Sequence, residues 1–134
     1  MADKSALARL SARSVDERLA PMIRRGEVAT CSIVQLEYLF SARSARDYEV
    51  TRQQFETGYP KVGIDQKVLD RSVEVQSQLA NRGQHRGVAI PDLIIAATAE
   101  VAGLIVLHYD ADFDLLAEVT GQPTEWVVPR GTID

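Results

Sequence analysis

The sequence has few of the residues that disulfide-stabilised and membrane proteins use. It contains one cysteine in 134 residues, so it cannot form an internal disulfide. Cys31 lies in the apolar segment 28–31, which predicts a small buried residue in a protein of a reducing compartment. No apolar run approaches the roughly 20 residues of a membrane span, and residues 1–4 lack the apolar core of a signal peptide. We therefore expect a cytoplasmic protein with no membrane partner.

The motifs of several hydrolytic chemistries are also missing. There is no Gly-rich phosphate loop and no serine in a nucleophile elbow, and Cys31 has no evident histidine partner. The only two histidines, His85 and His108, have no partner at ligand spacing, which argues against zinc. We expect His85 in a surface loop and His108 at the end of a strand.

The charged residues are unevenly distributed along the chain. The net charge of −4 argues against broad non-specific attraction to nucleic acid, but basic and acidic residues lie in different regions. The first quarter is basic and the end is acidic: Lys4, Arg9, Arg13, Arg18, Arg24 and Arg25 against Asp110, Asp112, Asp114 and Glu118. The basic residues either line a groove or lie on solvated helix faces, and the sequence leaves both interpretations open.

Short apolar segments alternate with helical patterns along the chain. Apolar spacing and the residues that begin or end helices predict helices at 15–25, 32–42, 47–57, 66–82, 91–102 and 113–120. Apolar runs predict strands at 28–31, 61–64, 104–108 and 125–128. No internal repeat or linker interrupts this order, so we expect one domain, residues 1–134. Parallel strands need helical crossovers, which predicts an α/β fold with a parallel sheet covered by helices on both faces.

Five carboxylates lie in or beside apolar segments: Asp3, Glu37, Asp92, Asp110 and Asp112. Glu37 is inside segment 33–40 and Asp92 is inside segment 90–97, whereas Asp110 and Asp112 follow segment 104–107. Ligands of parallel sheets collect at the carboxyl ends of the strands, where we expect Asp3 and Asp110. The other three have simpler interpretations: Glu37 as a solvated helix residue, Asp92 as an acid favoured by the helix dipole, and Asp112 as an N-cap. Glu37 fits its simpler interpretation least, because its neighbours on the predicted helix are mostly apolar.

Together, the five acids indicate a bound cation. Two carboxylates about 4 Å apart repel by roughly 4 kcal/mol at an effective dielectric constant of about 20, and buried unpaired carboxylates are costly. Oxygen ligands select hard cations, which predicts Mg²⁺ or Mn²⁺ and makes Ca²⁺ less suitable. Such an ion lowers the pKa of a bound water and stabilises the charge that develops during phosphodiester hydrolysis. Ser5 either lies beside the metal or caps the first helix.

Several short segments in this order match a known family: 3–10, Leu36 and Glu37 followed by 41–43, 82–87, 91–100 and 108–113. They resemble the PIN-domain ribonucleases, specifically the VapC-type toxins of bacterial toxin–antitoxin pairs. The resemblance spans nearly the whole chain. It implies a single PIN-like domain, residues 1–134, built as a three-layer sandwich with a mostly parallel central sheet flanked by helices. It also implies a Mg²⁺- or Mn²⁺-dependent endoribonuclease that cleaves RNA and is inhibited by a cognate antitoxin.

The resemblance assigns roles to named residues. The acidic quartet of the family carries over to Asp3, Glu37, Asp92 and Asp110, with Asp112 as an accessory metal ligand and Ser5 as a nearby hydroxyl. Four residues are assigned to the approach of RNA: Lys4, Arg9, His85 and Arg86. In the family a longer apolar strand precedes the first Asp. Here only Met1 and Ala2 precede Asp3, so either the start lies upstream or this strand is truncated.

Other functions and assemblies follow from the same residues. Within the enzymes, the alternative is a nuclease of the same fold that acts on DNA or structured nucleic acid, because phosphate hydrolysis by metal ions does not identify the sugar. A non-catalytic binding module, whose acids only cap helices, is the alternative outside the enzymes. Apolar residues that one small sheet cannot cover, together with the family resemblance, predict a homodimer; these residues are Tyr38, Leu39, Tyr48 and Phe55.

Overall fold

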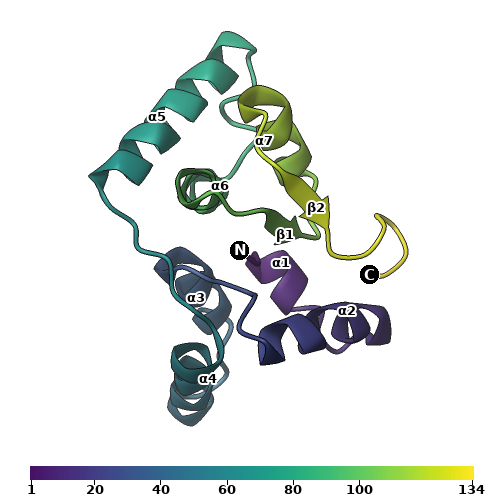
Figure 1. The fold of residues 1–134 in the computed structure, drawn as a ribbon. Helices are drawn as coiled ribbons and strands as arrows, with labels where there is room; N and C mark the ends of the chain where they lie inside the picture. The colour runs from purple at the N-terminus through teal and green to yellow at the C-terminus, as the bar shows by residue number, and fades with distance from the viewer.

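The computed structural model describes residues 1–134 as seven helices and two strands (Figure 1). Their bounds are α1 (Lys4–Leu7), α2 (Arg13–Arg24), α3 (Ser32–Leu39), α4 (Ala45–Gly58), α5 (Gln66–Asn81), α6 (Ile90–Ala102), β1 (Val106–His108), α7 (Asp112–Thr120) and β2 (Thr124–Trp126). Every predicted helix is present, with ends that differ from the prediction by at most three residues. The α/β prediction is confirmed.

The sheet is parallel but shorter than predicted. Strands β1 and β2 form a parallel pair in which His108 lies opposite Trp126. An isolated parallel bridge joins Ala2 to Leu107, and the Asp3 N–H donates to the Leu107 carbonyl at 2.9 Å. The first strand is therefore reduced to one bridging residue, because helix α1 follows it directly. This bridge places Asp3 beside the carboxyl end of β1.

The strands predicted at 28–31 and 61–64 are wrong in extent. Only an isolated parallel bridge between Thr30 and Lys61 is present there. The Thr30 N–H donates to the Pro60 carbonyl at 2.9 Å. Pairing does not extend further, because α3 begins two residues after Thr30 and Pro60 has no N–H to donate.

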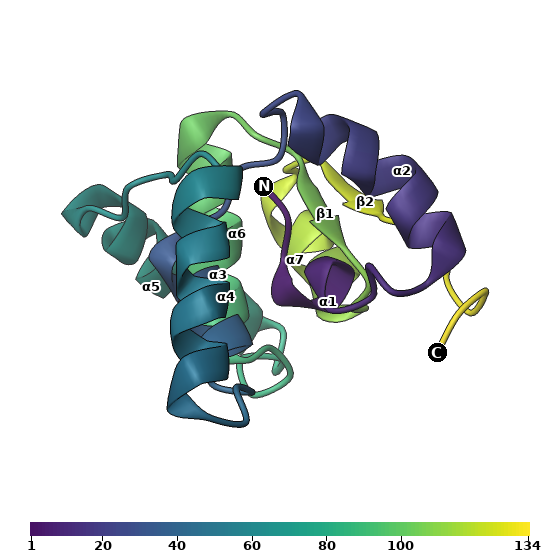
Figure 2. The same cartoon turned by 90° about the horizontal axis from the view of Figure 1, so that it is seen from below.

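Helices cover both faces of the sheet. Figure 2 shows α2 on one side of the strands and α3, α4 and α6 on the other, which is the predicted three-layer arrangement. Helix α6 is buried on most sides, as its residues Leu93, Ile95, Ala96 and Ala99 show. It is followed by Gly103, which adopts the left-handed conformation (φ 69°) that ends the helix. The first turn of α6 lies at the carboxyl edge of the sheet and carries Asp92. None of the seven helices combines the length and the hydropathy that a membrane span requires.

The apolar residues on which the homodimer prediction relied are mostly internal. Leu39 and Phe55 are buried, and the rings of Tyr38 and Phe55 meet edge to face with centroids 5.3 Å apart. Of the four residues only Tyr48 is substantially exposed. That basis for the prediction is therefore wrong, because α3 packs against α4 and buries these side chains between them. The exposed large apolar residues lie elsewhere and include Leu36, Phe40, Val73 and Ile90.

Candidate active site

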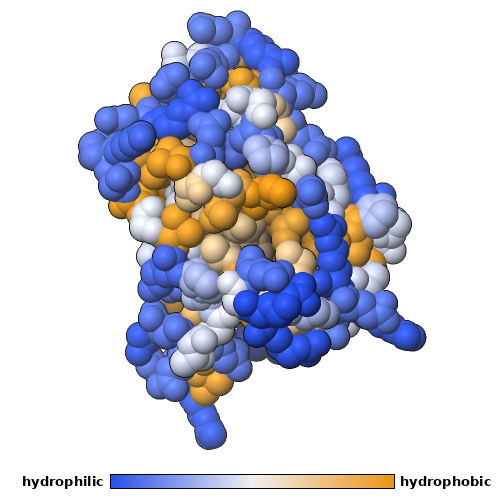
Figure 3. All heavy atoms as spheres, in the orientation of Figure 1, coloured by the Kyte–Doolittle hydropathy of each residue, from blue (hydrophilic) through white to orange (hydrophobic).

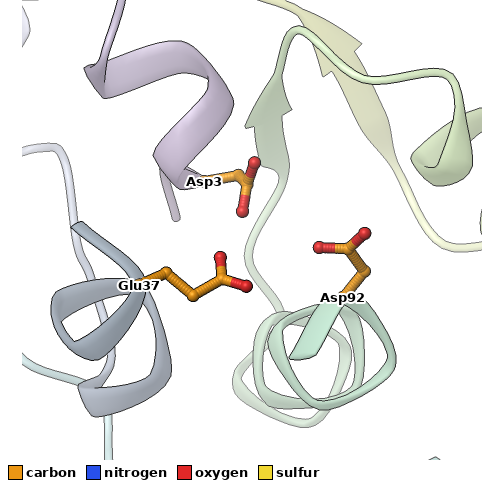
Figure 4. Close-up of side chains that lie close together, drawn as sticks. All are labelled: Asp3, Glu37 and Asp92. Carbon is orange, nitrogen blue, oxygen red and sulfur yellow. The ribbon is translucent and has the colours of Figure 1, made fainter. Parts of the chain in front are cut away.

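The structure brings together the five acids singled out from the sequence. Asp3 precedes α1, Glu37 lies on α3, and Asp92 lies in the first turn of α6. Asp110 and Asp112 follow β1, where the chain enters α7. Figure 4 shows the Asp3, Glu37 and Asp92 side chains pointing toward one another from three different elements.

The five carboxylates form two overlapping groups. One oxygen from each of Asp3, Glu37 and Asp92 lies within 4.8 Å of the others. The same holds for Asp92, Asp110 and Asp112. Asp92 belongs to both groups and therefore connects them. These residues would suit one divalent ion or a pair of ions.

Asp3 combines a structural role with a free ligand atom. The residue is only 3% exposed, and its Oδ2 caps α1 by accepting the Ser5 N–H at 2.8 Å. The other oxygen, Oδ1, is buried and has no hydrogen-bond partner. A buried carboxylate oxygen without a partner is costly unless a cation or a proton satisfies it. The residues present therefore fit a divalent cation.

The shared position of Asp92 changes its protonation. Burial, followed by the charges of Asp3, Asp110, Glu37 and Asp112, raises the pKa of Asp92 to about 8. Without a cation its carboxyl group is thus largely protonated at neutral pH. The helix N-terminus favours an ionised acid, but burial and the neighbouring charges outweigh this effect. The interpretation of Asp92 as an acid that only favours the helix dipole therefore does not account for its environment.

The same causes act more weakly on two neighbouring acids. Burial and then the charge of Asp3 raise the pKa of Glu37, while the positive charge of Lys4 opposes the shift. Burial and then the charge of Asp110 raise the pKa of Asp112. Glu37 is partly buried rather than a freely solvated helix residue. Bound positive charge would lower all of these pKa values and is therefore favoured at this position.

The turn after β1 is organised by hydrogen bonds that the sequence did not predict. The Asp110 carboxylate accepts the Asp112 N–H at 2.9 Å, and the Asp110 N–H donates to Nδ1 of His108 at 3.2 Å. Burial lowers the pKa of His108, whose ring centroid lies 5.1 Å from those of Phe113 and Trp126. Asp112 is the first residue of α7 rather than its N-cap, and it makes no capping bond. The N-cap interpretation of Asp112 is wrong, because α7 begins at Asp112 itself and Ala111 is its N-cap.

Ser5 joins α1 to the segment that leads to Asp110. Its Oγ accepts the Tyr109 N–H at 2.9 Å, which places the hydroxyl next to the turn that carries the acids. The interpretation of Ser5 as a cap is wrong, because Asp3 is the N-cap of α1. The only sequence signal for this contact is the spacing of two residues between Asp3 and Ser5.

The four predicted RNA-contacting residues differ in their surroundings. Lys4 lines a shallow hollow of about 300 Å³ with Leu36, Glu37 and Phe40, directly beside the acidic group. His85 and Arg86 are exposed in the turn between α5 and α6, so His85 lies in a surface loop as predicted. Arg9 is instead bound within the molecule, through the Ser5 and Asp134 carbonyls. Contact of these residues with RNA stays a prediction.

Comparisons with known proteins show the family of this chain. A family model described as PIN domain matches residues 1–119. Ribonuclease VapC21 of Mycobacterium tuberculosis is 45% identical, over 97% of this chain and 94% of that protein. Ribonuclease VapC18 of the same species is 40% identical, over 98% of this chain and 96% of that protein.

Solved structures with a similar fold include toxin–antitoxin complexes of the VapBC type. The crystal structure of VapBC2 from Rickettsia felis, bound to a DNA fragment from its promoter, superposes with a TM-score of 0.77. The alignment covers 94% of this chain and 97% of that chain at 15% sequence identity, which compares the fold alone. The chain therefore belongs to the PIN-domain family, and within it to the VapC ribonucleases.

Proposed function

We propose that the protein is a metal-dependent endoribonuclease and the toxin of a toxin–antitoxin pair. The observation that carries the proposal is the pair of carboxylate groups joined by Asp92, with a buried, unpartnered oxygen on Asp3. This site lies in a chain of which 97% aligns with a VapC ribonuclease at 45% identity. The reaction class is hydrolysis of RNA phosphodiester bonds.

Each acid has a role in holding Mg²⁺ or Mn²⁺. Asp3, Glu37, Asp92 and Asp110 are the principal ligands, and Asp112 is an accessory ligand. When bound, the cation supplies a water of lowered pKa and stabilises negative charge on the phosphate. Cation binding would favour the ionised form of Asp92, whose pKa is raised to about 8 by burial and then by the charges of four neighbouring acids.

The purified protein tests the proposal directly. We expect internal cleavage of single-stranded RNA in Mn²⁺ and no cleavage in chelator, because the acids alone provide no activated nucleophile. Single-stranded and duplex DNA of the same sequence serve as the comparison. Cleavage of DNA in preference to RNA would support the nuclease alternative. Failure to bind Mn²⁺ would support a non-catalytic binding module.

A cognate antitoxin is part of the proposal. Toxin–antitoxin complexes are among the proteins that share this fold. The surface beside the acids combines exposed apolar side chains with negative charge, which suits a protein partner. Leu36 is 60% exposed and Phe40 is 91% exposed, and both line the hollow that contains Glu37. An antitoxin segment with an apolar residue and a basic residue would cover the apolar pair and place positive charge at the acids.

We also propose a homodimer, formed by apolar residues other than those first considered. Val73 on α5 and Ile90 on α6 are 67% and 65% exposed, and they line a groove of about 240 Å³ with Leu69, Leu93 and Ile94. Figure 3 shows apolar residues gathered on this face between α5 and the centre of the molecule. We expect sedimentation to show a dimer at micromolar concentration and Val73→Asp to shift it toward monomer. A wild-type protein that stays monomeric would refute this proposal.

RNA binding should depend on Lys4, which lies beside Glu37, and on the exposed Arg86 in the turn between α5 and α6. We expect Lys4→Gln and Arg86→Gln to weaken RNA binding and to lower the slope of log K against log salt by about 0.7 for each lost phosphate contact. Arg13→Gln is the matched control, because Arg13 is an exposed arginine on α2 that pairs with Glu17. An unchanged salt slope in both variants would remove Lys4 and Arg86 from the RNA surface.

A further inference from the structure

The C-terminal residues are tied to the segment that leads to Asp110. The Tyr109 hydroxyl accepts the N–H groups of Gly131 and Ile133, at 2.9 and 3.2 Å, and donates to the Ile133 carbonyl at 2.7 Å. These three bonds use the full hydrogen-bonding capacity of a phenol hydroxyl. All of its partners belong to the last four residues of the chain, and Ile133 also packs against the core.

Arg9, two residues after the end of α1, also holds the C-terminal residues. Its Nε donates to the Asp134 carbonyl at 2.8 Å, and its Nη1 donates to the Ser5 carbonyl at 2.7 Å. The guanidinium carbon lies 4.6 Å from the centroid of the Tyr109 ring, within the range of a cation–π contact. One side chain therefore links α1, the C-terminal residues and Tyr109, and its planar fork reaches two acceptors at once.

Tyr109 connects the C-terminal residues to two of the acids, Asp3 and Asp110. The Tyr109 N–H donates to Ser5 Oγ at 2.9 Å, and the Ser5 N–H donates to Asp3 Oδ2 at 2.8 Å. On the other side Asp110 is the next residue in the chain. A shift of the Tyr109 backbone would therefore move Asp110 and loosen the contact that orients Asp3. The C-terminal residues contact neither acid themselves.

We propose that Arg9 and Tyr109 clamp residues 131–134 against α1 and thereby hold Asp3 and Asp110 in the geometry that binds the cation. Both are positioning residues, and the C-terminal residues are the third part of the clamp. The inference rests on the proposed function, because it assigns these residues to the same metal site. It also gives Arg9 a role other than the contact with RNA predicted from the sequence.

The test measures Mn²⁺ binding to the full-length, metal-free protein by calorimetry. Tyr109→Phe removes only the hydroxyl, and Arg9→Lys keeps the charge but cannot reach both carbonyls. We expect each variant to bind Mn²⁺ roughly 10- to 100-fold more weakly, as when groups that orient metal ligands are lost. We expect the double variant to be little weaker than either single variant, because both remove the same clamp. The KM for RNA and its salt dependence should stay unchanged.

Tyr48→Phe is the matched control, since Tyr48 lies on α4, away from the clamp. Equal Mn²⁺ affinity in Tyr109→Phe, Arg9→Lys and this control would overturn the clamp while leaving the proposed function intact. Normal Mn²⁺ binding by Arg9→Lys, with a reduced salt slope only in Arg9→Gln, would make Arg9 a phosphate ligand and also overturn it. A wild-type protein that binds no Mn²⁺ would instead contradict the proposed function, and the clamp with it.

Discussion

Asp92→Asn should lose RNA cleavage by about 100-fold or more in Mn²⁺, while the metal-free protein becomes as stable as the wild type or more stable. The amide keeps the shape of the side chain but removes the charge that both carboxylate groups share. Loss of a group that only orients a metal ligand costs about 10- to 100-fold, so loss of the shared ligand itself should reach at least the upper value. Stability should not fall, because the amide carries no charge at any pH, whereas the Asp92 carboxyl group must either keep a proton or be repelled by four neighbouring acids.

The matched control is Asp16→Asn, which makes the same change in the first turn of α2, where the acid is exposed. Loss of a favourable helix-dipole contact there should cost a few tenths to about 1 kcal/mol and leave cleavage unchanged. Melting temperature in chelator and RNA cleavage in Mn²⁺ measure the two effects separately. An Asp92→Asn protein that is destabilised but fully active would end the assignment of Asp92 as a metal ligand.

The helices could be predicted from local sequence because the signals that define them are local. The apolar spacing of α5 and the Asp65 cap lie within one segment, and Asp65 does accept the Val68 N–H in the structure. Helix α6 has a Pro in its first turn and a Gly directly after its end, and both residues act on their own backbone. Such positions need no knowledge of the rest of the fold.

The extent of the strands could not be predicted in the same way. A strand is defined by its partner, and the partners here are distant in sequence, such as Ala2 with Leu107. An apolar run shows that a segment is buried, but it does not show how many residues pair before the chain turns into a helix. The segment 28–31 was therefore predicted as a strand, whereas Thr30 alone forms a bridge.

In the candidate site, too, some features could be predicted from local sequence and others depend on contacts between distant segments. The rule that ligands collect at the carboxyl ends of parallel strands predicts the convergence of Asp3 and Asp110. The helical acids Glu37 and Asp92 were predicted from their apolar surroundings and from the family resemblance. Their protonation was not predictable, because the raised pKa of Asp92 depends on burial and on charges from three other elements. The contacts of His108 and Tyr109 were also missed, since each depends on a backbone turn that no local pattern specifies.

Divalent cations should stabilise the protein strongly, and the effect should grow from acidic to alkaline pH. The folded-state pKa of Asp92, about 8, lies above the value of about 3.9 for an unperturbed Asp. The folded state thus binds more protons than the unfolded state between these values, and stability of the metal-free protein from this group falls as pH rises toward 8. The raised pKa values of Glu37 and Asp112 act in the same direction.

Mn²⁺ should reverse this loss, because it replaces the proton as the positive charge among the acids. Free ligand at 100 times its dissociation constant stabilises the folded state by about 2.7 kcal/mol, which for a chain of this size raises the melting temperature by roughly 10 °C. Thermal melts with Mn²⁺ or chelator, at several pH values from 5 to 8, measure both effects. In Asp92→Asn the fall in metal-free stability with pH should become shallower. A melting temperature that Mn²⁺ leaves unchanged at pH 8 would show that these acids hold no cation.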